Sequence, residues 1–180
     1  MTKKKEIVIG VTGGISAYKA CELVRCLSRK GFGVTVLMSA EAKHFVGPLT
    51  FRTLSGRPVI SDMFSEDVAW DPCHVAIAEK ADVVVVVPAT AHTISKLAHG
   101  QCDDIISCVI MATKAKVIVC PAMNDNMYTH TAMRENMKKI AGFGYTIIEP
   151  IKGELACGKI GVGHLAGIDT ILKAIEKSLK

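Results

Sequence analysis

Short apolar runs alternate with longer amphipathic segments along this chain. The runs are EIVIGV, GVTVLM, DVVVVV, KVIVC and YTIIE, at 6–11, 33–38, 82–87, 116–120 and 145–149. Unbroken apolar runs of this length are typical of parallel strands that are buried on both faces. The segments between the runs place apolar side chains at helical spacing. We expect helices at 15–30, 41–45, 48–56, 74–80, 89–99, 105–112, 129–141 and 168–179.

This alternation of strands and helices predicts the fold class. Parallel strands need crossover connections, and helices in those connections cover both faces of the sheet. We therefore expect a three-layer, doubly wound α/β fold. The chain has 180 residues, 49% of them hydrophobic, which suits a single domain spanning 1–180.

Composition and charge narrow the class of protein. The net charge is +5 and aromatic residues make up only 5% of the chain, so nucleic-acid binding is disfavoured. The longest apolar run, 83–87, is far shorter than the ~20 residues that cross a bilayer. We see no secretory signal at the N-terminus. We expect a cytoplasmic protein that binds neither nucleic acid nor membrane.

The seven cysteines form no CxxC pair, and the chain contains no HExxH motif. In a cytoplasmic chain such cysteines are mostly small apolar core residues rather than a disulfide framework. We therefore expect no metal site.

Two loops after predicted strands have the chemistry of a phosphate site. The first loop, Thr12-Gly13-Gly14-Ile15-Ser16, lies between a predicted strand and a predicted helix. Its glycines let the backbone approach a ligand, and the start of the helix offers free N–H groups to an anion. It matches neither the GxGxxG fingerprint nor the P-loop, and a simple tight turn is the alternative. The segment 88–93, PATAHT, offers two hydroxyls that could cap a helix or hold a phosphate. Together the two loops make a mononucleotide site plausible.

Three further features remain open on the residues alone. Asn124, in PAMNDNMY, could hold a substrate or simply cap a helix. His74 is the best available general base, although a lone histidine is more often structural. The segment 154–166, ELACGKIGVGHLA, could be a phosphate cradle, a metal ligand, a disulfide partner or a mobile flap carrying a reactive thiol.

Four segments carry a resemblance to a known family. They are VTGGISAYKA, HVAIAEKADVVVVVPATAHTISKLAHG, PAMNDNMY and ACGKIGVGHLA. In this order they resemble the homo-oligomeric flavin-containing cysteine decarboxylases, and most closely the branch that acts in coenzyme A biosynthesis. The similarity runs from about Ile7 to Ile171. It implies a Rossmann-like or flavodoxin-like flavoprotein with FMN bound at a subunit interface of a homo-oligomer, a trimer or a dodecamer.

The resemblance also implies roles for individual residues. It implies that His74 and Cys157 are catalytic and that a flap at about 150–166 covers the substrate. Substrate contacts are implied for Asn124, Ala156 and Leu165. FMN contacts are implied for Gly14, Ile15, Ser16, Ser39, Phe45, Thr90, Ala91, His92, Thr93 and Ala122.

The implied reaction converts 4′-phosphopantothenoylcysteine to 4′-phosphopantetheine and CO₂. The cysteinyl group would be oxidised at FMN, lose CO₂ and be reduced again, with Cys157 as the proton donor. The chain departs from many relatives at His164, where an arginine is common, and at His92, where asparagine is common. We expect a separate ligase polypeptide to supply the substrate. The alternatives are a peptidyl-cysteine decarboxylase, a flavin prenyltransferase, a non-catalytic FMN-binding regulatory subunit and a nucleotide-binding structural protein.

Overall fold

A parallel sheet forms the centre of the computed structural model, which describes residues 4–64, 73–154, 158 and 160–180. The sheet has six strands in the order β3-β2-β1-β4-β5-β6, and every neighbouring pair is parallel. The strands are β1 (Glu6–Val11), β2 (Gly33–Met38), β3 (Val59–Ile60), β4 (Val83–Ala89), β5 (Lys116–Pro121) and β6 (Thr146–Ile147).

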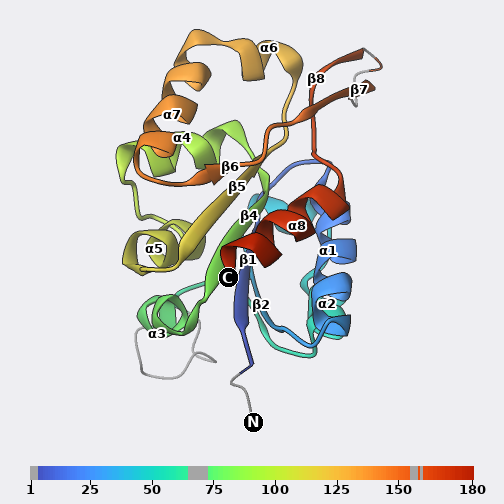
Figure 1. Cartoon of the computed structure of the whole chain (residues 1–180), viewed down its shortest axis with the longest axis vertical. Coiled ribbons are helices and arrows are strands. Elements are labelled where there is room, and N and C mark those ends of the chain that lie inside the picture. Colours follow the sequence, from blue (N-terminus) through green and yellow to red (C-terminus); the bar gives the residue numbers. More distant parts are fainter. Residues whose placement is uncertain (1–3, 65–72, 155–157, 159) are drawn as a thin grey trace.

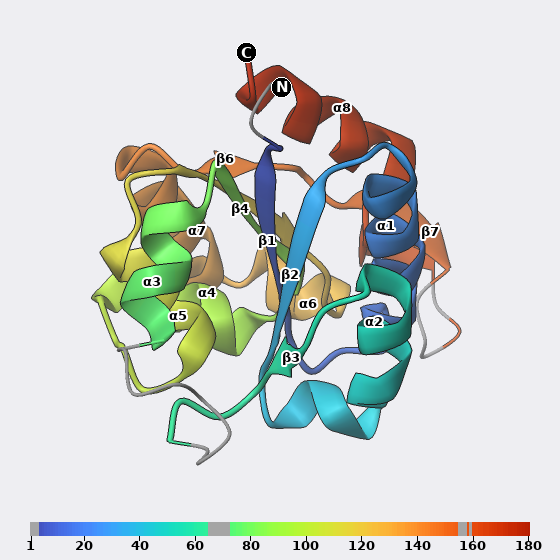
Figure 2. The ribbon, with the colours of Figure 1, turned by 90° about the horizontal axis from the view of Figure 1, so that it is seen from below.

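Helices cover both faces of this sheet, as Figures 1 and 2 show. On one face lie α1 (Ala17–Arg29), α2 (Pro48–Ser55) and α8 (Ile168–Ser178). On the other lie α3 (Cys73–Lys80), α4 (Ala91–His99), α5 (Ile105–Ala112) and α7 (Thr131–Gly142). The predicted three-layer α/β fold is confirmed.

The valine run of β4 explains why the buried strands read as continuous apolar sequence. Val83, Val85 and Val87 pack into the core on the side of α1 and α8. Val84 and Val86 pack into the opposite core, beside α4 and α5. Successive side chains of a strand point to opposite faces, so a strand covered on both sides needs an apolar residue at every position. Each buried valine contributes roughly 1.5–3 kcal/mol of transfer free energy.

Two strands extend further than the sequence pattern predicts. The predicted runs end at 87 and 120, yet β4 continues to Ala89 and β5 to Pro121, and these two residues pair with each other. The register between β4 and β5 shifts between Val86 and Ala89. Such irregularities are where a sheet tolerates a residue that has no N–H to donate. The opposite error occurs at β6, which contains two residues where five were expected.

Three elements were not predicted at all. One is β3, which pairs with β2 through Val59 and Ile60, and another is the short helix α6 (Asp125–Thr129). The third is an antiparallel hairpin formed by β7 (Ile151–Glu154) and β8 (Ile160–His164). Within the expected flap, 151–154 and 160–164 therefore form regular β structure.

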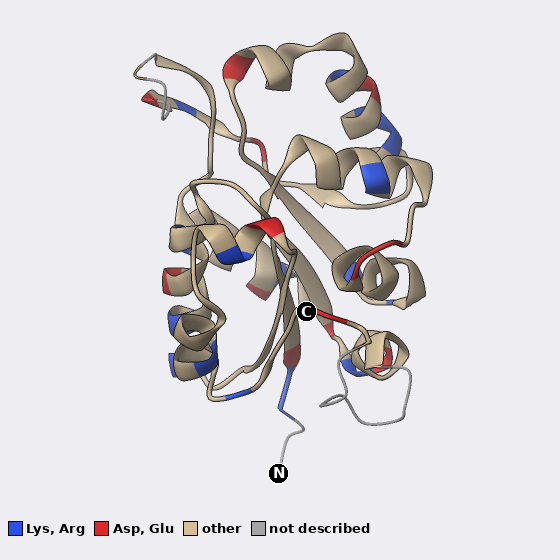
Figure 3. Cartoon of the chain, turned by 180° about the vertical axis from the view of Figure 1, so that it is seen from behind, with Lys and Arg blue, Asp and Glu red and all other residues tan. Residues whose placement is uncertain are grey.

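The chain reverses its direction of travel across the sheet between β1 and β4. It moves outward from β1 to β2 and β3, then returns to the other side of β1 and continues through β4, β5 and β6. A crevice opens beyond the carboxyl ends of the strands at such a switch point, and ligands bind there in open α/β sheets. Figure 3 shows the charged residues spread over the outer helices, while the central strands carry almost none. Within the described residues, no helix has the length and apolar character to cross a membrane.

Candidate active site

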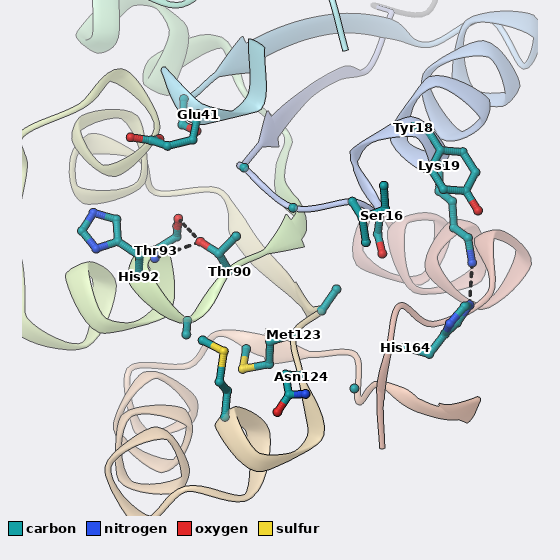
Figure 4. Close-up of a pocket in the computed structure, with 18 of the residues that line it drawn as sticks. Ser16, Tyr18, Lys19, Glu41, Thr90, His92, Thr93, Met123, Asn124 and His164 are labelled. Carbon is teal, nitrogen blue, oxygen red and sulfur yellow. Dashed lines mark hydrogen bonds between the residues drawn. The ribbon is translucent and has the colours of Figure 1, made fainter. Parts of the chain in front are cut away.

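A cavity of about 1030 Å³ lies at this switch point. Its walls come from the loops that follow β1, β2, β4 and β5 and from the hairpin strand β8, which Figure 4 shows around one space. This volume is at the upper end of the range of small-molecule sites. The cavity therefore has room for more than one ligand group.

The turn after β1 presents unpaired backbone donors. Gly14 N–H donates to the carbonyl of Thr12, and the carbonyl of Gly14 accepts from Ala17 N–H, so the predicted tight turn is present. The N–H groups of Ile15 and Ser16 bond to no part of the chain that the structure describes. They precede α1, where the helix dipole favours an anion.

Close packing explains one glycine of this turn. A Cβ added at Gly13 would lie 2.3 Å from the Cβ of Glu41, in the short 3₁₀ helix η1 (Glu41–His44). Glu41 itself lines the cavity. Its pKa is lowered by its own backbone N–H and by Ser39, with smaller contributions from His92 and Lys96. The loops after β1 and β2 therefore form one continuous wall.

Buried Thr12 ties the loops after β1 and β4 together. Its hydroxyl donates to the carbonyl of Pro88 at 2.7 Å and accepts from Thr90 N–H at 3.1 Å. Thr90 in turn caps α4, because its hydroxyl accepts from Thr93 N–H at 3.3 Å and lies 3.1 Å from the Thr93 hydroxyl. The predicted capping role is present, and the two hydroxyls also line the cavity.

Asn124 caps a helix, which is one of the two roles that the sequence left open, and it also lies at the cavity. Its Oδ1 accepts from Asn126 N–H at 2.9 Å, which makes it the N-cap of α6, and the residue also lines the cavity. Beside it, Met123 N–H donates to the carbonyl of Gly163 at 3.1 Å, so the loop after β5 is bonded to β8. The cap holds the amide in one orientation at the cavity wall.

An ion-pair cluster around the nearly buried Lys96 contributes Lys96 and Asp104 to another part of the wall. Lys96 Nζ lies 2.8 Å from both Asp103 Oδ1 and Asp104 Oδ2. Burial works to lower the pKa of Lys96, but hydrogen bonds to both aspartates outweigh it and raise that pKa. For Asp104, burial works to raise the pKa, while Lys96 and Ser107 lower it overall. Both partners are therefore held in their charged forms. Among the described residues, no His, Cys, Asp and Glu side chains are grouped as metal ligands.

The structure brings most of the sequence-predicted site residues to this cavity. The wall includes Gly14, Ile15, Ser16, Ser39, Thr90, Ala91, His92, Thr93, Ala122 and Asn124. Three others are not brought there within the described chain. Phe45 is half exposed at the end of η1, His74 lies in the first turn of α3 beside α5, and Leu165 is fully buried in the core. Ala156 and Cys157 lie outside the described residues.

Several wall residues were not singled out from the sequence. Helical spacing could have found two of them, because Lys19 follows Ser16 by three positions and Lys96 follows His92 by four. The wall residues from the hairpin lie in strands, where helical spacing gives no such signal. The unforeseen wall residues are Tyr18, Lys19, Glu41, Lys96, Asp104, Met123, Met127, Glu154 and Gly163, whereas Gly13 and His164 were noted in the sequence without a ligand contact being assigned to them.

The wall suits a phosphorylated planar cofactor. Free N–H groups before α1 and the hydroxyls of Ser16, Thr90 and Thr93 provide donors for a phosphate. Ala91, Ala122 and Met123 provide apolar surface on the same cavity. The arrangement can therefore bind a mononucleotide and leave the Asn124 side of the cavity for a second molecule.

Comparison with known proteins gives the family. The family described as Flavoprotein matches residues 1–180. The probable phosphopantothenoylcysteine decarboxylase of Streptococcus mutans is 42% identical over 99% of this chain and 100% of its own length. The coenzyme A biosynthesis bifunctional protein CoaBC of Bacillus subtilis is 41% identical over 98% of this chain, which spans only 44% of that longer protein.

Solved structures agree with these relatives. A mutant phosphopantothenoylcysteine decarboxylase in complex with pantothenoylaminoethenethiol superposes with a TM-score of 0.86 at 27% identity, covering 97% of this chain and 98% of the other. The FMN-dependent cysteine decarboxylase SpaF superposes with a TM-score of 0.84 at 26% identity, covering 98% of both chains. With a family match over residues 1–180 and relatives above 40% identity, this chain belongs to the Flavoprotein family, as its motifs predicted.

Proposed function

We propose that this protein is an FMN-dependent decarboxylase that converts 4′-phosphopantothenoylcysteine to 4′-phosphopantetheine and CO₂. One observation carries the proposal. The donors of the Gly14–Ser16 turn, the hydroxyls of Thr90 and Thr93, and the Asn124 amide line a single cavity at the switch point. The names of the relative in Streptococcus mutans and of the mutant decarboxylase support this substrate.

The cofactor phosphate would bind at the amino end of α1, held by the N–H groups of Ile15 and Ser16 and by the Ser16 hydroxyl. The flavin ring would lie against Ala91 and Ala122. When bound, FMN supplies the reversible two-electron chemistry that side chains lack. The similarity to SpaF, an FMN-dependent cysteine decarboxylase, supports this cofactor.

Asn124 would orient the substrate. Its Oδ1 accepts from Asn126 N–H, and the residue lines the cavity, where its amide would contact the carboxylate or amide of the cysteinyl group. An oriented donor lowers the entropic cost of reaching the reactive geometry. Cys157 would supply the proton that completes the product thiol.

His74 would act from a second copy of the chain. Its helix, α3, packs against α5, and the residue does not line the cavity of its own protomer. We therefore assign it to the cavity of a neighbouring protomer, where its imidazole would serve as a base. This arrangement requires a homo-oligomer, a trimer or a multiple of trimers, with the cavity at the interface.

The cytoplasm is the proposed location, since the substrate belongs to a metabolic pathway. A ligase that joins cysteine to a phosphorylated pantothenoyl acid must supply the substrate. The bifunctional relatives named CoaBC support such a partner.

The test is CO₂ release from 4′-phosphopantothenoylcysteine by the purified, FMN-loaded protein. We expect a yellow protein with a flavin spectrum and stoichiometric CO₂ and 4′-phosphopantetheine. A yellow protein that releases no CO₂ would be the non-catalytic alternative. CO₂ released only from peptides ending in cysteine would identify a peptidyl-cysteine decarboxylase.

Two variants with matched controls test the residue roles. His74→Asn should abolish CO₂ release, whereas His44→Asn, at an exposed position of η1, should not. Cys157→Ser should still release CO₂ but stall before the thiol product, whereas Cys102→Ser, at an exposed cysteine, should complete the reaction. Equal loss of both steps in Cys157→Ser would contradict its role as the proton donor.

A further inference from the structure

A lysine and a histidine from opposite ends of the chain meet at the cavity wall. Lys19 Nζ, on α1, lies 2.7 Å from His164 Nε2, on β8, and the two residues are 145 positions apart. Figure 4 shows the pair side by side, across the cavity from Thr90 and Thr93. Both residues line the cavity.

The hydrogen bonds define the form of the histidine. The Lys19 ammonium can only donate, so His164 Nε2 must accept and carries no proton. His164 Nδ1 lies 3.2 Å from the carbonyl oxygen of Glu154, which can only accept, so Nδ1 carries the proton. The imidazole is therefore neutral and cannot balance the charge of Lys19.

The charge of Lys19 has no partner of opposite sign in the described chain. The other lysine of the wall, Lys96, is paired with Asp103 and Asp104. No salt bridge joins Lys19 to any carboxylate among the described residues, although Glu41 and Glu154 also line the cavity. In Figure 4, Glu41 lies on the far side of the cavity from the pair. One donor of the ammonium is used by His164, and two remain for a ligand.

The position of the pair separates it from the cofactor phosphate. The proposed site of that phosphate uses the free N–H groups before α1 and the Ser16 hydroxyl, whereas the pair joins α1 to the hairpin that also contacts Met123. An anion held here therefore belongs to a molecule that enters beneath the hairpin. A phosphate carries about −1.5 to −2 charge and three acceptor oxygens. It is therefore bound more strongly by an ammonium group than a carboxylate is.

We infer that Lys19 binds the phosphate of the substrate and that His164 is a positioning residue that aims the ammonium at it. This inference rests on the proposed function and extends it to substrate selection. The phosphate is the same in substrate and product, so the contact contributes uniform binding and affects KM rather than kcat.

The test compares two substrates that differ only in the phosphate, 4′-phosphopantothenoylcysteine and pantothenoylcysteine. A charged hydrogen bond is worth about 1.5–3 kcal/mol, or roughly 10–100-fold. We expect wild type to prefer the phosphorylated substrate by that factor in KM, and Lys19→Met to lose the preference with little change in kcat. Lys43→Met, at an exposed position away from the cavity, should retain it.

Variants at His164 test its positioning role. His164→Leu should weaken the preference for the phosphorylated substrate, because the ammonium loses its acceptor. His164→Gln should restore most of it, because the amide oxygen can accept from Lys19 at a similar reach. A merely structural histidine would give no such difference between the leucine and glutamine variants.

Three outcomes would overturn the inference. If Lys19→Met raises KM equally for both substrates, Lys19 either contacts the substrate carboxylate or only stabilises the hairpin. Loss of bound FMN from Lys19→Met, seen as a colourless protein, would place it at the cofactor phosphate. The third is equal binding of 4′-phosphopantetheine and pantetheine to wild type by calorimetry. That measurement needs no turnover, so it separates failure of the subsite from failure of the proposed reaction.

Discussion

Replacing Gly163 with alanine tests how the hairpin is held over the cavity. Gly163 lies in β8 with φ at +153°, a backbone conformation that side chains disfavour. A Cβ added there would lie 2.1 Å from the carbonyl oxygen of Met123, well inside contact distance. The carbonyl of Gly163 also accepts a hydrogen bond from Met123 N–H at 3.1 Å. The substitution must therefore separate β8 from the loop that carries Asn124.

The expected loss of stability follows from the backbone conformation of Gly163 and from its hydrogen bond with Met123. The unfavourable φ costs about 1–3 kcal/mol, and the lost hydrogen bond about 0.5–1.5 kcal/mol. Together they give a loss of about 1.5–4.5 kcal/mol. In a chain of this size, each kcal/mol lowers Tm by about 2–4 °C. We expect Gly163→Ala to lower Tm by about 3–18 °C.

Gly144→Ala is the matched control. Its φ is +88°, but an added Cβ would meet nothing within 4 Å, so it isolates the conformational cost. Calorimetry would give Tm for both variants, and hydrogen exchange would report on the Met123 amide. We expect a larger loss in Gly163→Ala and faster exchange at Met123 in that variant alone. Equal Tm values with an equally protected Met123 amide would refute the contact argument.

Two further predictions concern charge and core. Burial works to raise the pKa of Asp104, but Lys96 outweighs burial and lowers that pKa in the folded state. The ionised carboxylate therefore stabilises the fold above the unfolded-state pKa of about 4, and this stabilisation is lost as pH falls through the folded-state pKa. Asp104→Asn should therefore make Tm fall less steeply at acid pH, whereas Asn in place of the exposed Asp62 should leave the pH dependence of Tm unchanged. The same pH dependence of Tm in both variants would contradict a stabilising ion pair between Asp104 and Lys96. Phe51→Ala should cost about 3–5 kcal/mol by urea unfolding, since Phe51 is 0% exposed. Phe64→Ala, at 86% exposure, should change stability by less than about 0.5 kcal/mol, and similar losses would place Phe51 outside the core.

The sequence predicted the central strands within a residue or two because burial on both faces demands unbroken apolar runs. It failed where an element depends on its neighbour rather than on its own pattern. The two residues of β3 form a strand because β2 offers an edge to pair with. Likewise α6 begins because Asn124 caps it, and β7 and β8 are strands because each pairs with the other.

The candidate site divides in the same way. The TGGIS and PATAHT loops could be recognised because glycines and hydroxyls at a helix start have a local chemical meaning. The Lys19–His164 contact had no local signal, since its partners are 145 positions apart and meet only when the hairpin lies beside α1. His74, assigned from its motif, lies away from the cavity of its own chain.

By itself, the sequence determined the layers of the fold, the chemistry of its turns and the family to which the chain belongs. These properties follow from periodicity and from short motifs, which act over a few residues. Only the tertiary structure decided which loops share a cavity, that Lys96 is neutralised by Asp103 and Asp104, and that Lys19 faces a neutral histidine instead. Those outcomes depend on the order β3-β2-β1-β4-β5-β6 and on where the hairpin lies, and no local pattern along the chain encodes either.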